Sequence, residues 1–143
     1  MNRTVTSTND LQTKGNAATP HKTKLNNNEP IEWTNWDNMS AAGAIISSSN
    51  DMAKWMIMHL NNGVIDADTL LNPTQQNTLW TLHNNYTLSS RGKEVIPGRH
   101  FSGYGLGYGL QDYYGRMIVS HGGGYAVMFS RLDIKNDENL GEM

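Results

Sequence analysis

The spacing of apolar residues changes twice along the chain and indicates three stretches. Residues 1–40 hold few apolar side chains among many polar ones, and we expect an Asn-rich loop, or strap, on the surface of a larger body. Residues 41–100 carry helical patterns and predict a segment of a helical lobe. Residues 101–143 carry the alternation typical of strands. The chain is therefore expected to have an α+β fold, with two or more helices followed by antiparallel strands.

The clearest helical pattern follows the polar residues 47–51, which suit the start of a helix. The residues 61–63, Asn-Asn-Gly, suit its end. A second helix is predicted to begin after Asn72, because Pro73 then occupies the first helical position, and to end near residues 83–85. The apolar face of the first helix consists of Met52, Trp55, Met56, His59 and Leu60.

Four side chains on these predicted helices are assigned by their residue types. Trp55 and Trp80 are expected to pack inside the protein, because both fall within helices. Asp51 and Lys54 are expected to lie on solvated helix surface, as charged residues usually do.

The C-terminal stretch predicts an antiparallel sheet. Large side chains alternate with glycines over residues 104–110, which predicts one strand with a bare face that something must press on. Residues 112–115 suit a turn, and residues 116–120 and 125–134 suit further strands. The chain stops where another strand would begin, so we expect an incomplete sheet with an exposed edge.

Composition excludes several functions. The 143 residues include 11 Lys and Arg against 13 Asp and Glu, which does not suit a strongly basic nucleic-acid binder, so no nucleic-acid partner is expected. The absence of cysteine removes disulfides, thiolate zinc sites and cysteine nucleophiles. The five histidines lack the spacing typical of metal ligands, and no metal is expected. No apolar run reaches the roughly 18 residues of a membrane span, so no membrane segment is expected in this chain.

The sharpest candidate site is the run Ser120-His121-Gly122-Gly123-Gly124, at the end of a predicted strand. Successive glycines expose backbone N–H groups and allow a ligand to approach closely, and the histidine adds a donor or a pH-sensitive charge. On spacing alone, a glycine-rich turn with a surface histidine remains the alternative. The phosphate-loop pattern is absent, and so is the Gly-x-Ser-x-Gly elbow that follows the oxyanion loop of α/β-hydrolases.

Several segments, taken in order, resemble the C-terminal half of the serine β-lactamase-like hydrolases. This group includes class C β-lactamases, D-alanyl-D-alanine carboxypeptidases and related esterases. The resemblance covers about residues 1–141 and rests on the ordered set of motifs more than on any one of them. The matching segments are residues 41–55, 60–63, 70–73, 104–108, 115–116 and 121–124.

The resemblance implies a role for each residue of the glycine run. His121, Gly122 and Gly123 match the family's Lys-Thr-Gly, His-Thr-Gly or His-Gly-Gly triplet, which lies on the sheet strand beside the active site. By this resemblance the triplet would bind substrate, with His121 meeting the substrate carboxylate or helping proton transfer, and the Gly124 N–H would be a catalytic oxyanion donor. The resemblance also implies part of a β-lactamase/transpeptidase-like fold, a small-molecule or peptide substrate, no cofactor, and a periplasmic or secreted full-length protein.

The family's other two motifs are not found in a matching context. Its nucleophile lies in Ser-x-x-Lys on a buried helix and its second base element is Tyr-x-Asn or Ser-x-Asn, and both are expected to precede Met1. The literal Ser-x-x-Lys at residues 90–93 is expected to be a chance match in a polar loop, and Ser48-Ser49-Asn50 is expected to cap a helix.

The leading hypothesis is therefore the C-terminal part of a serine hydrolase that forms an acyl-enzyme on a peptide, β-lactam or ester and is inactive alone. The histidine in place of lysine in the triplet favours a peptidase or esterase over an efficient β-lactamase. An alternative is a non-catalytic module that binds a peptide or carboxylate with the same strand. A third hypothesis is self-association through the open sheet edge.

Overall fold

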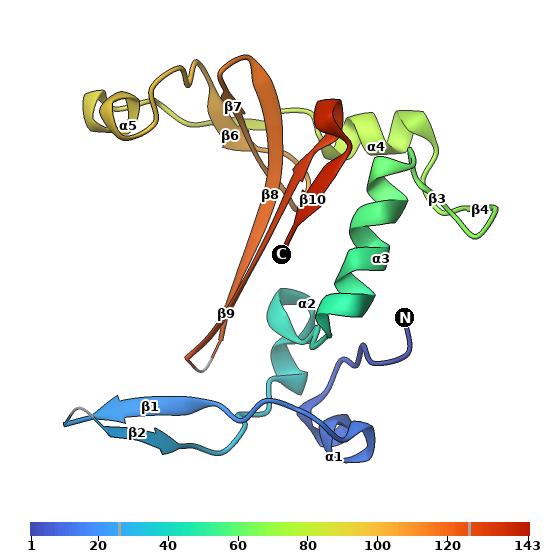
Figure 1. The fold of residues 1–143 in the computed structure, drawn as a ribbon, viewed down its shortest axis with the longest axis vertical. Coiled ribbons are helices and arrows are strands. Elements are labelled where there is room, and N and C mark those ends of the chain that lie inside the picture. Colours follow the sequence, from blue (N-terminus) through green and yellow to red (C-terminus); the bar gives the residue numbers. More distant parts are fainter. Residues whose placement is uncertain (26, 126) are drawn as a thin grey trace. The chain divides into compact units, whose positions relative to one another are not determined.

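The computed structural model describes residues 1–25, 27–125 and 127–143 of the chain (Figure 1). The fold is mixed, with short helices and antiparallel sheets, and it confirms the expected α+β class. The chain divides into two compact units. The first unit contains Met1–Met52 and Gly122–Ser130, and the second contains Ala53–His121 and Arg131–Met143. No helix among the described residues is long and apolar enough to span a bilayer.

The first unit begins with short elements whose side chains are mostly exposed. Val5 is buried and pairs with Ile46 through two backbone hydrogen bonds of 2.9 Å, which join the start of the chain to the segment before the longest helix. The division of the chain into a strap, a helical segment and a sheet segment stays a prediction. The elements are η1 (Thr8–Asp10), α1 (Leu11–Lys14), β1 (His21–Lys24), β2 (Asn27–Pro30), η2 (Asp37–Met39) and α2 (Ser40–Gly43).

A buried carboxylate at the start of α3 (Ser49–Leu60) holds the N-terminal segment. Asp51 is only 2% exposed, so the expectation that it is solvated is wrong. Its carboxylate accepts hydrogen bonds from the Arg3 N–H at 2.8 Å and the Thr4 hydroxyl at 2.9 Å. Burial alone would raise the pKa of Asp51, but these hydrogen bonds outweigh it and the pKa is lowered. Lys54 is exposed, as expected.

The two predicted helices are present in the structure. The first is α3, and Ser48 caps it as expected, because the Asp51 N–H meets the Ser48 hydroxyl at 3.3 Å. The second is α4 (Pro73–Leu79), which begins with a complete capping box between Asn72 and Gln75. The expected end of this helix at residues 83–85 is wrong.

Helix α4 ends early because the backbone that follows it joins the main sheet. The His83 N–H donates to the Tyr104 carbonyl at 3.0 Å, and β5 (Asn84–Asn85) then pairs with β6 (Ser102–Tyr104). A chain that pairs with a strand cannot continue the helical hydrogen bonds. The remaining elements of this part are β3 (Val64–Ile65), β4 (Asp68–Thr69) and α5 (Ser90–Val95).

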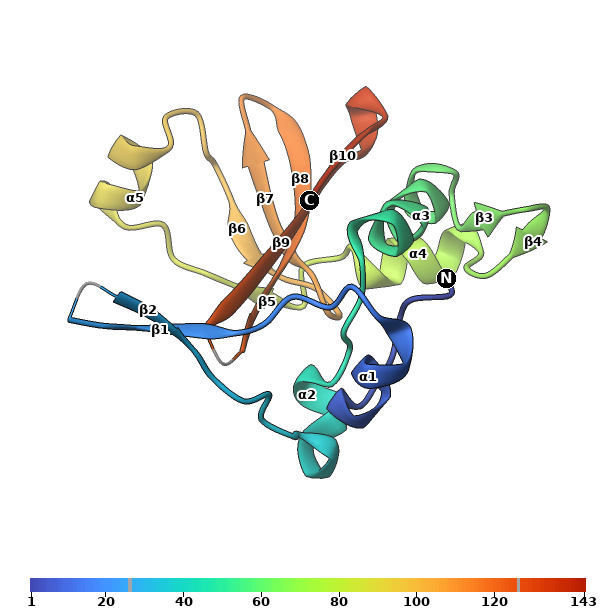
Figure 2. The same ribbon diagram turned by 60° about the horizontal axis from the view of Figure 1, so that its bottom comes forward.

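The main sheet has six strands in the order β10-β9-β8-β7-β6-β5 (Figure 2). The remaining strands are β7 (Gly109–Tyr113), β8 (Arg116–Tyr125), β9 (Met128–Lys135) and β10 (Leu140–Glu142). The described pairings are antiparallel, as expected. Strand β10 lies at one edge of this order, and self-association through the edge stays a prediction.

The expectation of one strand over residues 104–110 is wrong, because β6 ends at Tyr104 and β7 begins at Gly109. The chain turns between them because it meets the end of α4. The Leu106 N–H donates to the Leu79 carbonyl at 3.0 Å, and a Cβ at Gly105 would lie only 2.2 Å from that carbonyl oxygen. The end of α4 is therefore the element that presses on the bare glycine face at this point.

The core of the second unit lies where α3 meets the main sheet. One close approach is at Gly141 in β10, where a Cβ would lie 3.0 Å from the Met56 sulfur. The buried apolar side chains of α3 and of the sheet exclude water from the contact between them. This exclusion of water is the main stabilising contribution in a unit of this kind. The buried apolar residues of this core are Met56, Met58, Tyr108, Leu110, Val119, Leu132 and Ile134.

Gly63 and Gly107 both have a positive φ, but only Gly63 lies against neighbouring backbone. Gly63 has φ +86, and a Cβ there would lie 1.9 Å from the Leu71 carbonyl oxygen. Gly107 has φ +83, and a Cβ there would have no neighbour within 4 Å.

We expect Gly107→Ala to lower the free energy of unfolding by about 1–2 kcal/mol through backbone strain alone. Gly63→Ala should lower it by about 1–3 kcal/mol more, because it adds an overlap. Urea unfolding of both variants measures the difference, and equal losses would contradict the close approach.

Candidate functional site

The candidate residues 121–124 all lie within β8, directly after Ser120, where the pairing of β8 with β7 ends. The alternative of a glycine-rich turn is therefore wrong. None of the three glycines adopts the left-handed backbone conformation that a tight turn would need. His121 and the glycines are exposed, so this stretch of a sheet strand presents its backbone to solvent.

Two of the three glycines are not required by backbone geometry or by packing. A Cβ at Gly122 would lie 3.8 Å from the Ser130 carbonyl oxygen, and one at Gly124 would lie 3.5 Å from the Phe129 ring, which are ordinary contacts. Gly123 differs, because a Cβ there would lie 2.6 Å from the Ser130 hydroxyl. The missing side chains at Gly122 and Gly124 thus leave space that a ligand can use.

His121 carries the only titratable side chain of this candidate run. Its ring is exposed, and the described residues provide no hydrogen bond to it. The neighbouring Ser120 hydroxyl donates to the Gly109 carbonyl on β7 at 3.5 Å. His121 is therefore able to meet a ligand without breaking a contact of its own.

A buried hydrogen-bond network lies between α3 and the start of β7. The helical pattern in the sequence places its histidine, His59, on the apolar face but does not indicate the network. His59 is fully buried, and its Nε2 lies 2.8 Å from the Tyr108 hydroxyl. The Trp55 Nε1–H donates to that hydroxyl at 3.2 Å, and the Gln76 amide donates to the His59 carbonyl at 3.0 Å. The Trp55 and Trp80 rings lie 5.0 and 5.5 Å from the His59 ring, so both tryptophans pack as expected. The expectation that Trp80 falls within a helix is wrong, because α4 ends at Leu79.

Burial sets the charge state of this network. It lowers the pKa of His59, although the Gln76 contact opposes the shift, and it raises the pKa of Tyr108. Both groups are therefore neutral at neutral pH. A neutral pair of this kind stabilises the contact between α3 and the sheet. Because both side chains are buried, a substrate in solution does not reach them.

A second pair of polar residues connects the loop before β6 to β7. The buried carboxylate of Asp112 accepts from the His100 ring at 2.5 Å, and from the N–H groups of His100 and Phe101 at 2.6 and 2.8 Å. Burial would raise the pKa of Asp112, but these hydrogen bonds outweigh it and lower the pKa to about 2. Because no regular spacing links these residues, the sequence offered no signal for the pair.

Comparison with known proteins gives the chain a family. The family model described as Beta-lactamase matches residues 1–136. The chain belongs to the beta-lactamase family. This confirms the resemblance to serine β-lactamase-like proteins drawn from the ordered motifs.

A solved structure shares the fold of this chain. The chain is similar to the octameric penicillin-binding protein homologue from Pyrococcus abyssi, with a TM-score of 0.72 and 15% sequence identity. The match covers 99% of this chain and 29% of that chain, so this chain spans less than a third of the length of its structural relative. At this identity the likeness shows the fold alone. No curated protein sequence matches the chain.

This beta-lactamase family chain contains a Ser-x-Asn sequence at residues 48–50 and a Ser-x-x-Lys sequence at residues 90–93, and the two lie in different structural elements. Residues 48–50 lie at the start of α3, where Ser48 acts as the expected cap. Residues 90–93 lie in α5 and not in a loop, so that part of the expectation is wrong. The helix forms because the Ser89 hydroxyl accepts from the Gly92 N–H at 3.1 Å. Ser90 and Lys93 are exposed, unlike the buried helix start that a nucleophile motif requires.

Within residues 1–25, 27–125 and 127–143, no three His, Cys, Asp or Glu side chains gather in a way that could hold a metal ion.

The lowered pKa values of His59 and Asp112 predict two pH ranges over which the free energy of unfolding falls as pH drops. Because the pKa of His59 is lower in the folded state, the unfolded chain takes up this proton first, and stability should fall as pH drops below about 6.5. Because the pKa of Asp112 is lowered to about 2, its contribution is present above about pH 4 and is lost between about pH 4 and 2. Urea unfolding across pH 2–8 measures both transitions.

Two histidine variants make the upper transition specific. His59→Gln should remove the slope of unfolding free energy between about pH 5 and 7, because the buried titrating group is gone. His83→Gln is the matched control, since His83 is exposed, and it should keep the slope. An unchanged slope in His59→Gln would contradict the assignment.

Proposed function

We propose that this chain is the C-terminal part of a serine hydrolase of the beta-lactamase family. It would supply the strand that binds the substrate carboxylate and stabilises the oxyanion, and it would be inactive alone. The observation that carries the proposal is the exposed run of residues 121–124 inside β8, with open space at two glycines. Membership of the family and the match to 29% of a longer structural relative support it.

The proposed roles follow from the chemistry of the strand. A serine from the remainder of the hydrolase would attack a peptide, β-lactam or ester carbonyl and break its bond to the amine or alkoxide, which stays attached to the acyl group when the substrate is a β-lactam. Water would then hydrolyse the acyl-enzyme. The Gly124 N–H would donate to the developing oxyanion, and loss of one such donor typically costs about 2.7–4 kcal/mol of transition-state stabilisation. His121 would meet the substrate carboxylate or help proton transfer, and Gly122 and Gly123 would form the floor under the substrate. A peptidase or an esterase is favoured over a β-lactamase, because histidine replaces the lysine of the triplet.

Covalent labelling tests the claim that this chain lacks the nucleophile. The 143-residue chain should take up no stoichiometric label from a fluorophosphonate or a penicillin, because Ser90 and the other serines lack a buried lysine partner. Mass spectrometry of the intact chain measures the label, and a complete serine hydrolase serves as the positive control for each probe. Stoichiometric labelling would contradict inactivity of the chain alone.

A second function, a non-catalytic module that binds a peptide carboxylate, is favoured by the same open strand. A short peptide with a free C-terminal carboxylate would then bind the chain alone, and its amidated form would bind more weakly. The matched variants are Gly122→Ala and Gly124→Ala, which fill the open space with ordinary contacts. They should change the free energy of unfolding by less than about 1 kcal/mol but weaken binding at least tenfold, and His121→Gln should weaken it as well.

Calorimetric titration of these variants separates the two functions. Saturable binding that the variants weaken would support the module. Absence of binding, together with absence of labelling, would support the incomplete hydrolase. Equal binding of the free and amidated peptides would remove His121 from a carboxylate site in either case.

A further inference from the structure

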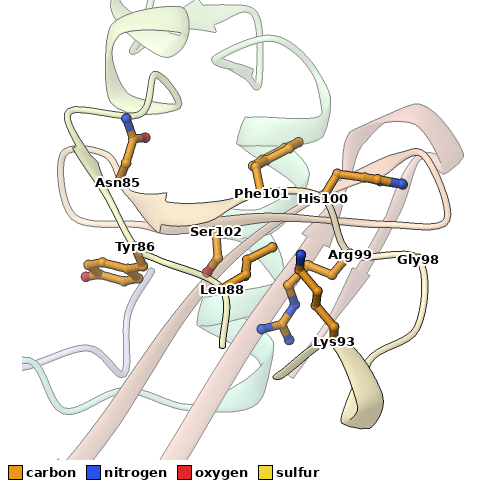
Figure 3. Close-up of a pocket in the computed structure, with 9 residues that line it drawn as sticks. All are labelled: Asn85, Tyr86, Leu88, Lys93, Gly98, Arg99, His100, Phe101 and Ser102. Atoms are coloured by element: carbon orange, nitrogen blue, oxygen red, sulfur yellow. The ribbon is translucent and has the colours of Figure 1, made fainter. Parts of the chain in front are cut away.

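The second unit contains a pocket of about 560 Å³ that the proposed function does not use (Figure 3). We call it the cationic pocket. It is lined by residues from α5, from β5 and the segment after it, and from the start of β6 and the segment before it. Its cationic side chains are Lys93 and Arg99, and Leu88 and Phe101 contribute apolar surface. Ser102 adds a hydroxyl.

The charges of the cationic pocket are unbalanced. None of the nine residues that line it is acidic, and no ion pair among the described residues involves Lys93 or Arg99. Figure 3 shows both side chains extending into the same space, next to Leu88 and Ser102. Two like charges that share a pocket repel each other, and an anion between them would remove that repulsion.

Arg99 is already partly removed from water. Its Nε is shielded from solvent and has no hydrogen-bond partner in the described chain. A polar group in this condition is costly, and the lower local dielectric strengthens any charge pair formed by the rest of the guanidinium. The fork of the guanidinium matches two oxygens of a carboxylate or phosphate, so the residue is suited to an oxyanion.

The pocket residues are held by the fold and are not carried on a free loop. Lys93 lies on α5, whose start is capped by Ser89. Arg99 follows Gly98, which has φ +79 and packs against the Tyr114 ring, because a Cβ there would lie 3.1 Å from it. Asp112 then binds the two backbone N–H groups that come directly after Arg99. Such positioning reduces the entropy that a ligand would otherwise lose on ordering the site.

We propose that the cationic pocket binds a small organic oxyanion, with its carboxylate or phosphate group between Lys93 and Arg99 and its apolar part against Leu88 and Phe101. The polar group would also accept a hydrogen bond from the Ser102 hydroxyl. This site is separate in sequence from the glycine strand, and it does not depend on the hydrolase proposal. A carboxylate and a phosphate would both be bound by the same two cationic side chains. Titration with one probe of each kind distinguishes them.

Calorimetric titration of the 143-residue chain with phenyl phosphate, inorganic phosphate and hexanoate tests the proposal. We expect saturable binding of phenyl phosphate or hexanoate, weaker binding of inorganic phosphate, which lacks the apolar part, and weaker binding of all three at high salt. The stronger of the two organic probes identifies the preferred anion. Absence of saturable binding for all three probes would overturn the proposal.

Variants of the two cationic residues assign the binding to this pocket. Lys93→Gln and Arg99→Ala should each weaken binding of the preferred probe at least tenfold, and Arg99→Lys should restore only part of the loss, because lysine lacks the fork. Arg91→Ala is the matched control, since Arg91 lies on the same helix and does not line the pocket, and it should stay within twofold of the unmodified chain.

Structural loss is separated from loss of binding by the thermal midpoint and the far-UV circular dichroism of each variant. If Arg99→Ala fails to fold, Lys93→Gln and Arg99→Lys carry the test. His83→Gln should leave phenyl phosphate binding unchanged, since His83 is exposed and lies outside both proposed sites. The Lys93 and Arg99 variants leave residues 121–124 intact, so failure of the strand proposal is distinguishable from failure of this one. Equal affinity in the unmodified chain, Lys93→Gln and Arg99→Lys would overturn the assignment.

Discussion

The buried hydrogen bond between His59 and Tyr108 is the constraint on which the arrangement of the second unit depends. Helix α3 places apolar side chains against the sheet, and the buried His59 ring inside that contact is paired through its Nε2, while its Nδ1 has no hydrogen-bond partner among the described residues. Because an unpaired buried group costs about 1–3 kcal/mol, loss of the Nε2 hydrogen bond would add a second such cost. The pair fixes the helix against the residue directly before β7. Because β7 pairs with residues 116–120 of β8, the same contact supports the first half of that strand.

The parts of the fold that the sequence predicted are those specified by local signals. The starts of α3 and α4 were correct because a serine cap and a proline in the first turn act within a few residues. The strand over residues 104–110 was wrong because its alternation has the period of a strand, whereas the turn results from contact with the Leu79 carbonyl, more than twenty residues earlier in the chain. Tertiary contacts of this kind leave no periodic signal.

The same distinction holds for the candidate site. The order of motifs identified the family and the glycine run, but a run of glycines reads equally as a turn or a strand until its neighbours in the sheet are known. Asp51 was misassigned because its partners, Arg3 and Thr4, are 48 and 47 residues away. His59 could have been found, since its helical phase placed it on the apolar face, where a histidine must be paired.

The strand order of the main sheet has a consequence for how the chain folds. The order β10-β9-β8-β7-β6-β5 follows the sequence without a crossover, so each strand pairs with its neighbour along the chain. The hairpin of β7 and β8 closes through only Tyr114 and Gly115, and such hairpins form in about 1–10 μs. Pairing between neighbours keeps the contact order of the sheet low, which favours rapid assembly. We therefore expect the docking of α3 to follow assembly of the sheet, because its histidine and Tyr108 are 49 residues apart.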